Sequence, residues 1–326
     1  MDSDEKIIMM VGVCLTKLSE GAISWVNAFS EGVFNHGDQV FPIARREHLE
    51  FLGAECDVSV QVADQHFSNN NVSPLMMYKK DQPCGAFEGF ALENFRAGII
   101  HVQKKNNKPR IILDRGFVSA PDYFSVCINE IKRLGLLHTA NSPSDRWGKL
   151  DISPPQWRTD GNHVLVIGQN EHGTGTQSIR QRGMSFLDWS NKTLQNIRKY
   201  TNRKIIYKPH PNQKRLPSPV ERCTLLPLGK SKIDKYLSDC WCAVAAASNG
   251  AADCVMNGIP VITNDPMSIV YGISSHGIEE INNPKTPDIS QWLNDTAYSQ
   301  WNVEEMKSGE TWRYIKNHLT GGTDGT

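Results

Sequence analysis

The chain has 326 residues, of which 39% are apolar and 21% are charged, and its 35 Lys and Arg residues balance its 35 Asp and Glu residues. This composition is ordinary for a globular protein with room for two domains, and the charge balance gives no sign of a polyanion partner for the chain as a whole. No stretch approaches the ~20 apolar residues of a membrane span, and residues 1–5 are too acidic to begin a signal peptide. We therefore expect a soluble, cytoplasmic protein with no membrane span.

The first part of the chain alternates strands with helices. Apolar runs predict buried strands, and apolar residues at helical spacing predict helices. The predicted strands are 7–15, 40–43, 57–63 and 110–113, and the predicted helices are 21–34, 85–100 (continuing toward Lys105) and 122–134. This alternation predicts an α/β domain over residues 1–140, with a doubly wound parallel sheet.

Residues 141–162 are rich in turn-forming residues, which predicts an interdomain linker. The strands predicted after it are 163–167, 204–208, 224–226, 243–247 and 259–263. The helices predicted after it are 186–200, 233–240, 251–257, 290–299 and 303–319. We expect residues 163–300 to form a second Rossmann-like domain, and residues 301–326 to form a closing helix with a disordered tail at 321–326.

Two short motifs follow strands of this second domain. Lys208 ends one predicted strand and begins Lys208-Pro209-His210-Pro211, and Ser248-Asn249-Gly250 follows the strand 243–247 as a helix cap. Parallel strands place their carboxyl ends at one edge of the sheet, and a helix N-terminus attracts anions. The motifs together predict a phosphate site at that edge, although each alone is also typical of a plain turn or a helix cap.

The order and spacing of these residues resemble the C-terminal domain of GT-B glycosyltransferases, in particular the capsule-polysaccharide type with an HP motif and a serine motif. The resemblance covers residues 163–312, and residues 297–301 and 304–312 are similar to the tails of glycosyltransferases from phage and bacterial surface-glycan clusters. It implies an α/β fold of the GT-B class, with two Rossmann-like domains facing across a cleft. It also implies a nucleotide-sugar donor, for which we expect a UDP-sugar.

In that family the HP histidine and the serine motif hold the donor phosphate, and an acidic residue one helical turn after the serine bonds the ribose. By this resemblance His210, Ser248, Asn249 and Asp253 lie at donor-binding positions, although Asp253 stands where many relatives carry Glu. The remaining donor-binding candidates are Lys208, Gly250, and Gln169 and Glu171 of the polar loop 168–176.

Glycosyl transfer requires a group that neutralises the leaving phosphate. Lys208, His210 and the helix N-terminus near Ser248 can supply it without a metal. The metal-binding triplet Asp-X-Asp occurs only at residues 2–4, ahead of the first predicted strand, and the eight cysteines are scattered as reduced core thiols rather than spaced as metal ligands. We therefore expect an inverting transfer that requires no metal.

Inversion also requires a base that takes the acceptor proton, and we expect it on the first domain. Asp114, directly after the strand 110–113, is the first candidate. His36, Asp38 and Asp64 also lie at the ends of predicted elements, and all of these residues are equally common in plain turns. In the polar loop, Glu171 and His172 compete for the base role or for donor contact.

The sequence leaves the acceptor open. Residues 189–220 include many Lys and Arg residues and no acidic residue, a pattern typical of a solvated surface or of a phosphate-attracting rim. An acceptor hydroxyl on a 5-hydroxymethylpyrimidine of phage DNA and one on a surface glycan both fit. A nucleotide-sugar epimerase and a non-catalytic sugar-nucleotide-binding protein are the alternative functions, and the oligomeric state is not indicated.

Overall fold

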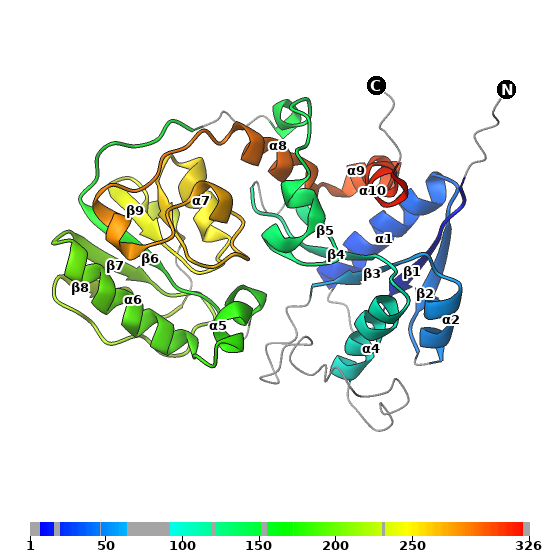
Figure 1. Cartoon of the computed structure of the whole chain (residues 1–326), viewed down its shortest axis with the longest axis horizontal. Helices are drawn as coiled ribbons and strands as arrows, with labels where there is room; N and C mark the ends of the chain where they lie inside the picture. The colour runs from blue at the N-terminus through cyan, green and yellow to red at the C-terminus, as the bar shows by residue number, and fades with distance from the viewer. Residues whose placement is uncertain are drawn as a thin grey trace. The chain divides into compact units, whose positions relative to one another are not determined.

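The computed structural model describes residues 7–15, 20–45, 47–63, 92–118, 122–150, 155–171, 173–229 and 232–321. The chain divides into two compact units, each built around one sheet (Figure 1). The first unit contains the described parts of residues 1–64, 74–131 and 299–326, and the second contains those of residues 132–298. No described helix combines the length and the apolar character that crossing a bilayer requires.

The first unit contains a six-stranded sheet with the order β11-β5-β4-β3-β1-β2. Its parallel strands are β1 (Met10–Cys14), β2 (Gln39–Ile43), β3 (Val58–Val62) and β4 (Arg110–Arg115). Its helices include α1 (Glu20–Asn35), α2 (His48–Ala54) and α4 (Leu92–Lys105). Val11, Val60 and Leu113 are fully buried, so these parallel strands form the core of the unit.

One edge of this sheet differs from the sequence prediction. The pattern predicts a helix at 122–134, but the structure has strand β5 (Phe124–Ile128) there, followed by the 3-10 turn η3 (Lys132–Leu134). β5 runs antiparallel to β4, and β11 (Gln300–Trp301) runs antiparallel to β5. Both partners come from other parts of the chain, and their pairing overrides the local helical spacing. The sheet is therefore mixed rather than wholly parallel.

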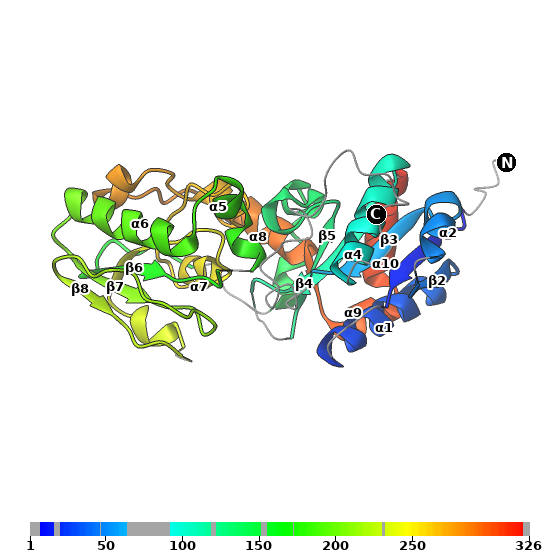
Figure 2. The same ribbon diagram turned by 90° about the horizontal axis from the view of Figure 1, so that it is seen from below.

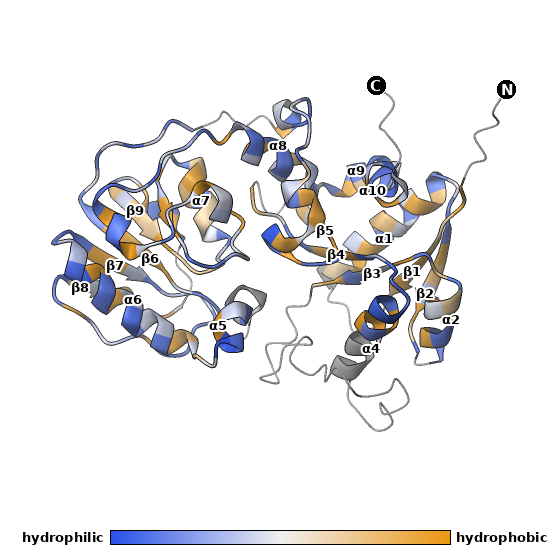
Figure 3. Ribbon diagram, viewed as in Figure 1, coloured by the Kyte–Doolittle hydropathy of each residue, from blue (hydrophilic) through white to orange (hydrophobic). Residues whose placement is uncertain are grey.

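The second unit contains a five-stranded, wholly parallel sheet with the order β10-β9-β6-β7-β8. Its strands are β6 (His163–Ile167), β7 (Lys204–Lys208), β8 (Cys223–Leu225), β9 (Cys240–Val244) and β10 (Val261–Ile262). Its helices are α5 (Gln177–Gln181), α6 (Phe186–Tyr200), α7 (Gly250–Met256) and α8 (Ser290–Tyr298). Leu194 and Ile197 of α6 pack with Val164 and Tyr207 of the strands in one buried cluster. Figure 3 accordingly shows orange strands beside a helix α6 that carries both blue and orange.

β9 lies earlier in the chain than the pattern predicts. The strand predicted at 243–247 is Cys240–Val244, and the helix predicted at 233–240 is only the 3-10 turn η7 (Asp234–Tyr236). Residues 245–247 continue past the end of the strand as a buried turn. This turn leads directly to Ser248.

The C-terminal helices belong to the first unit. α9 (Val303–Ser308) lies alongside α1 (Figures 1 and 2), and α10 (Glu310–Thr320) follows it. The single helix predicted at 303–319 is divided because Gly309 has a φ of 85°, a left-handed conformation that ends α9. Trp312 of α10 packs edge-on against Phe29 of α1, with ring centroids 6.0 Å apart. Beyond Gly321 the predicted tail lies outside the described residues.

The segment between the two predicted domains is part of the second unit. The backbone N–H of Ser142 donates to Asp295 of α8 at 2.7 Å, and the buried Arg146 donates through Nε to the carbonyl of Ala297 at 2.8 Å. The Trp157 indole likewise donates to the carbonyl of Pro287. Hydrogen bonds therefore hold Ser142, Arg146 and Trp157 of the predicted linker 141–162 to α8 and to the segment just before it.

Candidate functional site

The predicted donor-binding residues gather at the carboxyl edge of the second sheet. β9, β6 and β7 are adjacent parallel strands, and Ile167 of β6 pairs with Lys208 while Val166 pairs with Val244. The loop 168–176, the turn 209–213 and the turn 245–249 therefore leave the sheet at the same edge. Ligands of open α/β sheets bind at this edge.

The HP motif gives His210 a defined proton position. The backbone N–H of Asn212 donates to Nδ1 of His210 at 3.0 Å, so a neutral imidazole carries its proton on Nε2. The His210 side chain is half-buried. An Nε2–H group held in this way is suited to donate to an anionic oxygen.

Gln213, which the sequence analysis does not identify, holds the HP turn in shape. Its buried side chain donates through Nε2 to the hydroxyl of Tyr207 at 2.9 Å and to the carbonyl of Arg215 at 2.7 Å. Its Oε1 accepts from the backbone N–H of His210 at 3.3 Å. A glutamine three residues after a histidine in a loop is a weak sequence signal, so this role emerges only from the contacts.

Gly168 lets the loop after β6 approach the HP motif closely. Its N–H donates to the carbonyl of Lys208 at 2.7 Å. A Cβ at this position would lie 2.8 Å from that carbonyl oxygen, 2.8 Å from Cα of Pro209 and 2.6 Å from Oε1 of Gln213. Glycine is therefore required here by the close approach of two backbones.

The loop 168–176 is braced by its own side chains. Gln169 is buried, and its Nε2 donates to the carbonyl of Ala247 at 3.3 Å, whereas its Oε1 finds no hydrogen-bond partner within the described part of the chain. Arg180 donates to the carbonyl of Glu171 at 2.7 Å, and the Glu171 carboxylate lies 3.6 Å from the guanidinium of Arg215. His172 lies outside the described residues. Gln169 thus connects the loop to the serine turn, while the Glu171 carboxylate faces Arg215.

The serine turn differs from the helix N-terminus that the sequence predicts. α7 is short, and its cap residue Asn249 has a helical φ of −64° and makes no side-chain capping bond. The N–H groups of Gly250, Ala251 and Ala252 donate to the Ser248 hydroxyl, the Ser248 carbonyl and the Asn249 carbonyl. Because the first turn closes on itself, stabilisation of an anion depends on side chains more than on the N–H groups of this helix.

Lys208 and Asp253 influence each other's ionisation. Burial lowers the pKa of Lys208, and the charge of Asp253 opposes that shift. Burial, with a smaller contribution from the charge of Asp234, raises the pKa of Asp253 to about 6, and the charge of Lys208 opposes this rise. Asp253 nevertheless keeps an exposed surface, so solvent screens its interactions with both charges. The site therefore holds a buried cation beside a carboxylate that titrates near neutral pH.

Asp114 lies at the carboxyl edge of the first sheet. It is half-buried within β4, one residue after the pairing of Leu113 with Val62, and its carboxylate accepts from the N–H of Arg115 at 2.8 Å. β4 is two residues longer than the predicted strand, so Asp114 is the penultimate strand residue rather than the first loop residue. The edge is the one at which α/β sheets bind ligands.

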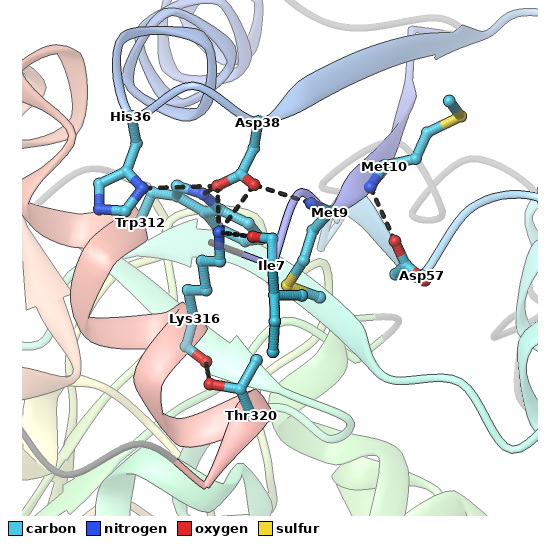
Figure 4. A network of polar contacts seen from close by, with 9 residues as sticks. All are labelled: Ile7, Met9, Met10, His36, Asp38, Asp57, Trp312, Lys316 and Thr320. Carbon is cyan, nitrogen blue, oxygen red and sulfur yellow. Dashed lines mark hydrogen bonds and ion pairs between the residues drawn. The ribbon is translucent and has the colours of Figure 1, made fainter. Parts of the chain in front are cut away.

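His36 and Asp38 lie at the opposite, amino-terminal edge, before β2 begins. The buried carboxylate of Asp38 accepts from the Met9 N–H at 2.8 Å, the Trp312 indole at 2.6 Å and the Lys316 ammonium at 2.8 and 3.0 Å (Figure 4). Nδ1 of His36 is 3.5 Å from the same carboxylate. These contacts hold the Asp38 carboxylate at the amino-terminal edge of the sheet. The base role of His36 or Asp38 stays a prediction. Asp64, the remaining alternative, lies outside the described residues.

Among the described residues, no group of three or more His, Cys, Asp or Glu side chains is arranged to hold a metal ion. The described cysteines are free thiols, and burial raises the pKa of Cys56 to about 11 and that of Cys240 to about 12. These thiols therefore stay protonated near neutral pH and serve as core residues. Metal independence of the reaction stays a prediction.

No protein-family model and no curated protein sequence matches the chain. Among solved structures, its two-unit α/β architecture is similar to that of GT-B glycosyltransferases, and two such structures come from one bacterial protein. The β-Kdo 2,4-transferase of KpsC from Thermosulfurimonas dismutans is 14% identical, has a TM-score of 0.53, and matches over 95% of this chain and 98% of its own. The β-Kdo 2,7-transferase of KpsC is 15% identical, with a TM-score of 0.48 over 95% of this chain and 100% of its own. The fold is GT-B, with two Rossmann-like units.

Proposed function

We propose that the protein is a glycosyltransferase that moves a sugar from a nucleotide-sugar, most simply a UDP-sugar, to an acceptor hydroxyl. The observation that carries this proposal is the convergence of Lys208, His210 and Ser248 at one edge of a parallel sheet. A buried ammonium, an imidazole with its proton on Nε2 and a hydroxyl form a donor set suited to phosphate oxygens. The GT-B fold supports the proposal as an analogy.

Each of the named residues has one role in the proposed reaction. When the acceptor oxygen attacks the anomeric carbon, the bond from that carbon to the phosphate oxygen breaks and its electrons go to the phosphate. Lys208, His210 and Ser248 stabilise this growing charge, and Asp253 accepts a hydrogen bond from the ribose. Asp114 takes the proton of the acceptor hydroxyl. The transfer inverts the anomeric carbon because the acceptor attacks in one step from the face opposite the leaving phosphate. This scheme requires no metal ion.

Two acceptor classes, a surface glycan and phage DNA, are each supported by a separate observation. A surface glycan is supported by the likeness to the KpsC structure, because that protein is a Kdo transferase. A 5-hydroxymethylpyrimidine of phage DNA is supported by Lys214 and Arg215, two exposed cations that follow the HP motif. Glycan is the first candidate and DNA the second.

A donor panel tests the proposal. The protein is incubated with UDP-, GDP- and CMP-sugars, each with a bacterial surface glycan, with hydroxymethylcytosine DNA, or without acceptor, and each in buffer with excess EDTA. Release of nucleotide that requires an acceptor and persists in EDTA is the expected result. Turnover that returns only with Mn²⁺ or Mg²⁺ contradicts metal independence. A changed nucleotide-sugar formed without acceptor identifies an epimerase instead.

Site variants test the donor-binding residues. We expect His210→Ala and Ser248→Ala to weaken nucleotide binding in calorimetry by roughly tenfold, because each removes a hydrogen bond to a charged group. Ser218→Ala is the matched control, since Ser218 is exposed and its backbone N–H, not its hydroxyl, bonds to Asn191. The melting temperature should stay nearly constant in all three. Unchanged affinity in both site variants removes the phosphate role.

A further inference from the structure

Lys132 connects the start of the second unit to the serine turn. It is the first residue of that unit, is only 6% exposed, and adopts a φ of 53°, which is unusual for a residue other than glycine. Its ammonium donates to the carbonyl of Ala247 at 2.5 Å and to Oδ1 of Asn249 at 2.7 Å. These acceptors lie on either side of Ser248. The long side chain therefore spans the turn that carries the serine hydroxyl.

Three separate segments meet at the carbonyl of Ala247. It accepts from Lys132 of η3 and from Nε2 of Gln169, which belongs to the loop after β6. Ala247 itself follows β9. One carbonyl oxygen thus joins the serine turn to the polar loop and to the beginning of the unit, and Lys132 contributes the charged and shorter of its two bonds.

Lys132 also brings a positive charge to this turn. The two acceptors described above are a peptide carbonyl and a side-chain amide, and both are neutral. The nearby imidazole of His138 is neutral as well, because burial and the charge of Lys132 lower its pKa to about 3. Both hydrogen bonds to the turn therefore come from a charged donor, which makes them stronger than bonds between neutral groups.

We propose that Lys132 is a positioning residue for the donor phosphate, because its two hydrogen bonds fix the turn 247–249 and thereby hold the Ser248 hydroxyl in place. This inference rests on the proposed nucleotide-sugar site. It also changes the expected role of Asn249, whose side-chain oxygen bonds to Lys132 and thereby supports the turn.

The test compares binding of a phosphorylated and an unphosphorylated ligand. Calorimetry with UDP, GDP and CMP, and NMR titration with the corresponding nucleosides, are carried out on the wild-type chain, Lys132→Met and Asn249→Ala. Lys204→Met is the matched control, because Lys204 is an exposed lysine at the amino-terminal start of β7. Melting temperatures are measured alongside.

We expect Lys132→Met to lose roughly tenfold or more in affinity for the nucleotide that the wild type binds, while affinity for its nucleoside changes by less than about twofold. Asn249→Ala, which keeps the ammonium, should show a smaller loss with the same selectivity, and it provides the test if Lys132→Met does not fold. Equal losses for nucleotide and nucleoside, or no loss, overturn the inference while leaving the proposed function intact. A wild-type chain that binds none of the three nucleotides overturns both.

Discussion

The carboxylate of Asp38, a candidate base in the sequence, makes several contacts within the first unit. Its position in a His-Gly-Asp turn before a strand is compatible with a base, but its carboxylate joins β1, β2 and α10 at the amino edge of the sheet (Figure 4). Burial by itself would raise the pKa of Asp38, but the bonds from Lys316, the Met9 N–H and Trp312 outweigh burial and lower that pKa. The ionised form is therefore the one that the fold stabilises.

We expect Asp38→Asn to lower the free energy of unfolding by about 3 kcal/mol, because it leaves the buried ammonium of Lys316 without its carboxylate. Asp57→Asn is the control, since Asp57 makes an exposed bond to the Met10 N–H and its loss should cost less than about 1 kcal/mol. The folded pKa of Asp38 is lower than the ordinary 3.8, so its contribution is complete above that pH and disappears as the pH falls through the folded pKa.

Chemical denaturation from pH 7 down to pH 3 measures this difference. The gap between the wild type and Asp38→Asn should narrow at the acid end. Nucleotide binding should be unchanged, because Asp38 lies in the first unit. If Asp38→Asn is as stable as the wild type at pH 7, Asp38 does not stabilise the fold in this way.

The raised pKa of Asp253 makes nucleotide binding dependent on pH. Its pKa is raised to about 6, so it is largely protonated at pH 5 and ionised at pH 7.5. If it accepts a hydrogen bond from the ribose, nucleotide affinity should rise more over this interval for the wild type than for Asp253→Asn, in which only the phosphate and His210 still titrate. Affinity measured by calorimetry in buffers of matched ionic strength decides this. Equal affinities and equal pH profiles for the wild type and Asp253→Asn exclude Asp253 from the site.

The raised pKa of Asp253 also affects the stability of the fold. Its effect on stability changes with pH in the opposite direction to that of Asp38. A raised folded pKa means that the native state favours the proton, so this contribution is complete below the ordinary value of 3.8 and is lost as the pH rises through about 6. Asp253→Asn should therefore be at least as stable as the wild type at pH 8.

At the scale of elements, the close approach of two loops organises the candidate site. Gly168, after β6, lies against the backbone at the end of β7. We expect Gly168→Ala to cost about 1–3 kcal/mol in unfolding free energy, because the added methyl group meets fixed backbone atoms. It should also weaken nucleotide binding, since the HP turn must move.

Gly148→Ala is the control for Gly168→Ala. A Cβ at Gly148 meets no atom within 4 Å, and its φ lies outside the left-handed region. Thermal melts and calorimetry on the two variants separate the effect of crowding from the general effect of replacing glycine. If Gly168→Ala and Gly148→Ala have equal melting temperatures and equal nucleotide affinities, the close approach of the two loops does not organise the site.

Elements whose own residue pattern matches their structure could be predicted, and elements whose pattern favours a different structure could not. β6, β7 and α6 follow directly from apolar runs and helical spacing, and their observed bounds equal the predicted ones. β5 was not predicted because its own spacing suits a helix, and its antiparallel pairing with β4 and with β11 overrides that local pattern.

The same distinction applies to the candidate site. The HP and serine motifs are visible in sequence because each is a strand end followed by turn residues. Lys132 is 115 residues from Ala247, and Asp38 is 278 residues from Lys316, so neither contact has a local signal. The identity of Asp114 as the base stays a prediction.

At the scale of the whole molecule, several cations of the acid-free stretch 189–220 are engaged within the fold. Arg198 donates to the carbonyls of Thr201 and Arg203, and Arg203 stacks on Trp241 at 4.3 Å. Both are engaged in holding the connection from α6 to β7. Arg215 faces the Glu171 carboxylate, so the exposed Lys214 is the more suitable cation near the carboxyl edge to substitute. Substituting Lys214 alone therefore tests the acceptor without disturbing the fold.

The salt dependence of DNA binding separates the two acceptor classes. If the acceptor is DNA, each neutralised phosphate releases a counterion and adds about 0.9 to the slope of log affinity against log salt. Lys214→Glu should then weaken duplex binding and reduce that slope by about one. Lys199→Glu, a charge reversal at an exposed lysine near the end of α6, should leave the slope unchanged. Fluorescence anisotropy with hydroxymethylcytosine duplex over a salt series measures both. A wild-type chain that binds no duplex at low salt eliminates DNA, and a glycan hydroxyl then becomes the acceptor to pursue.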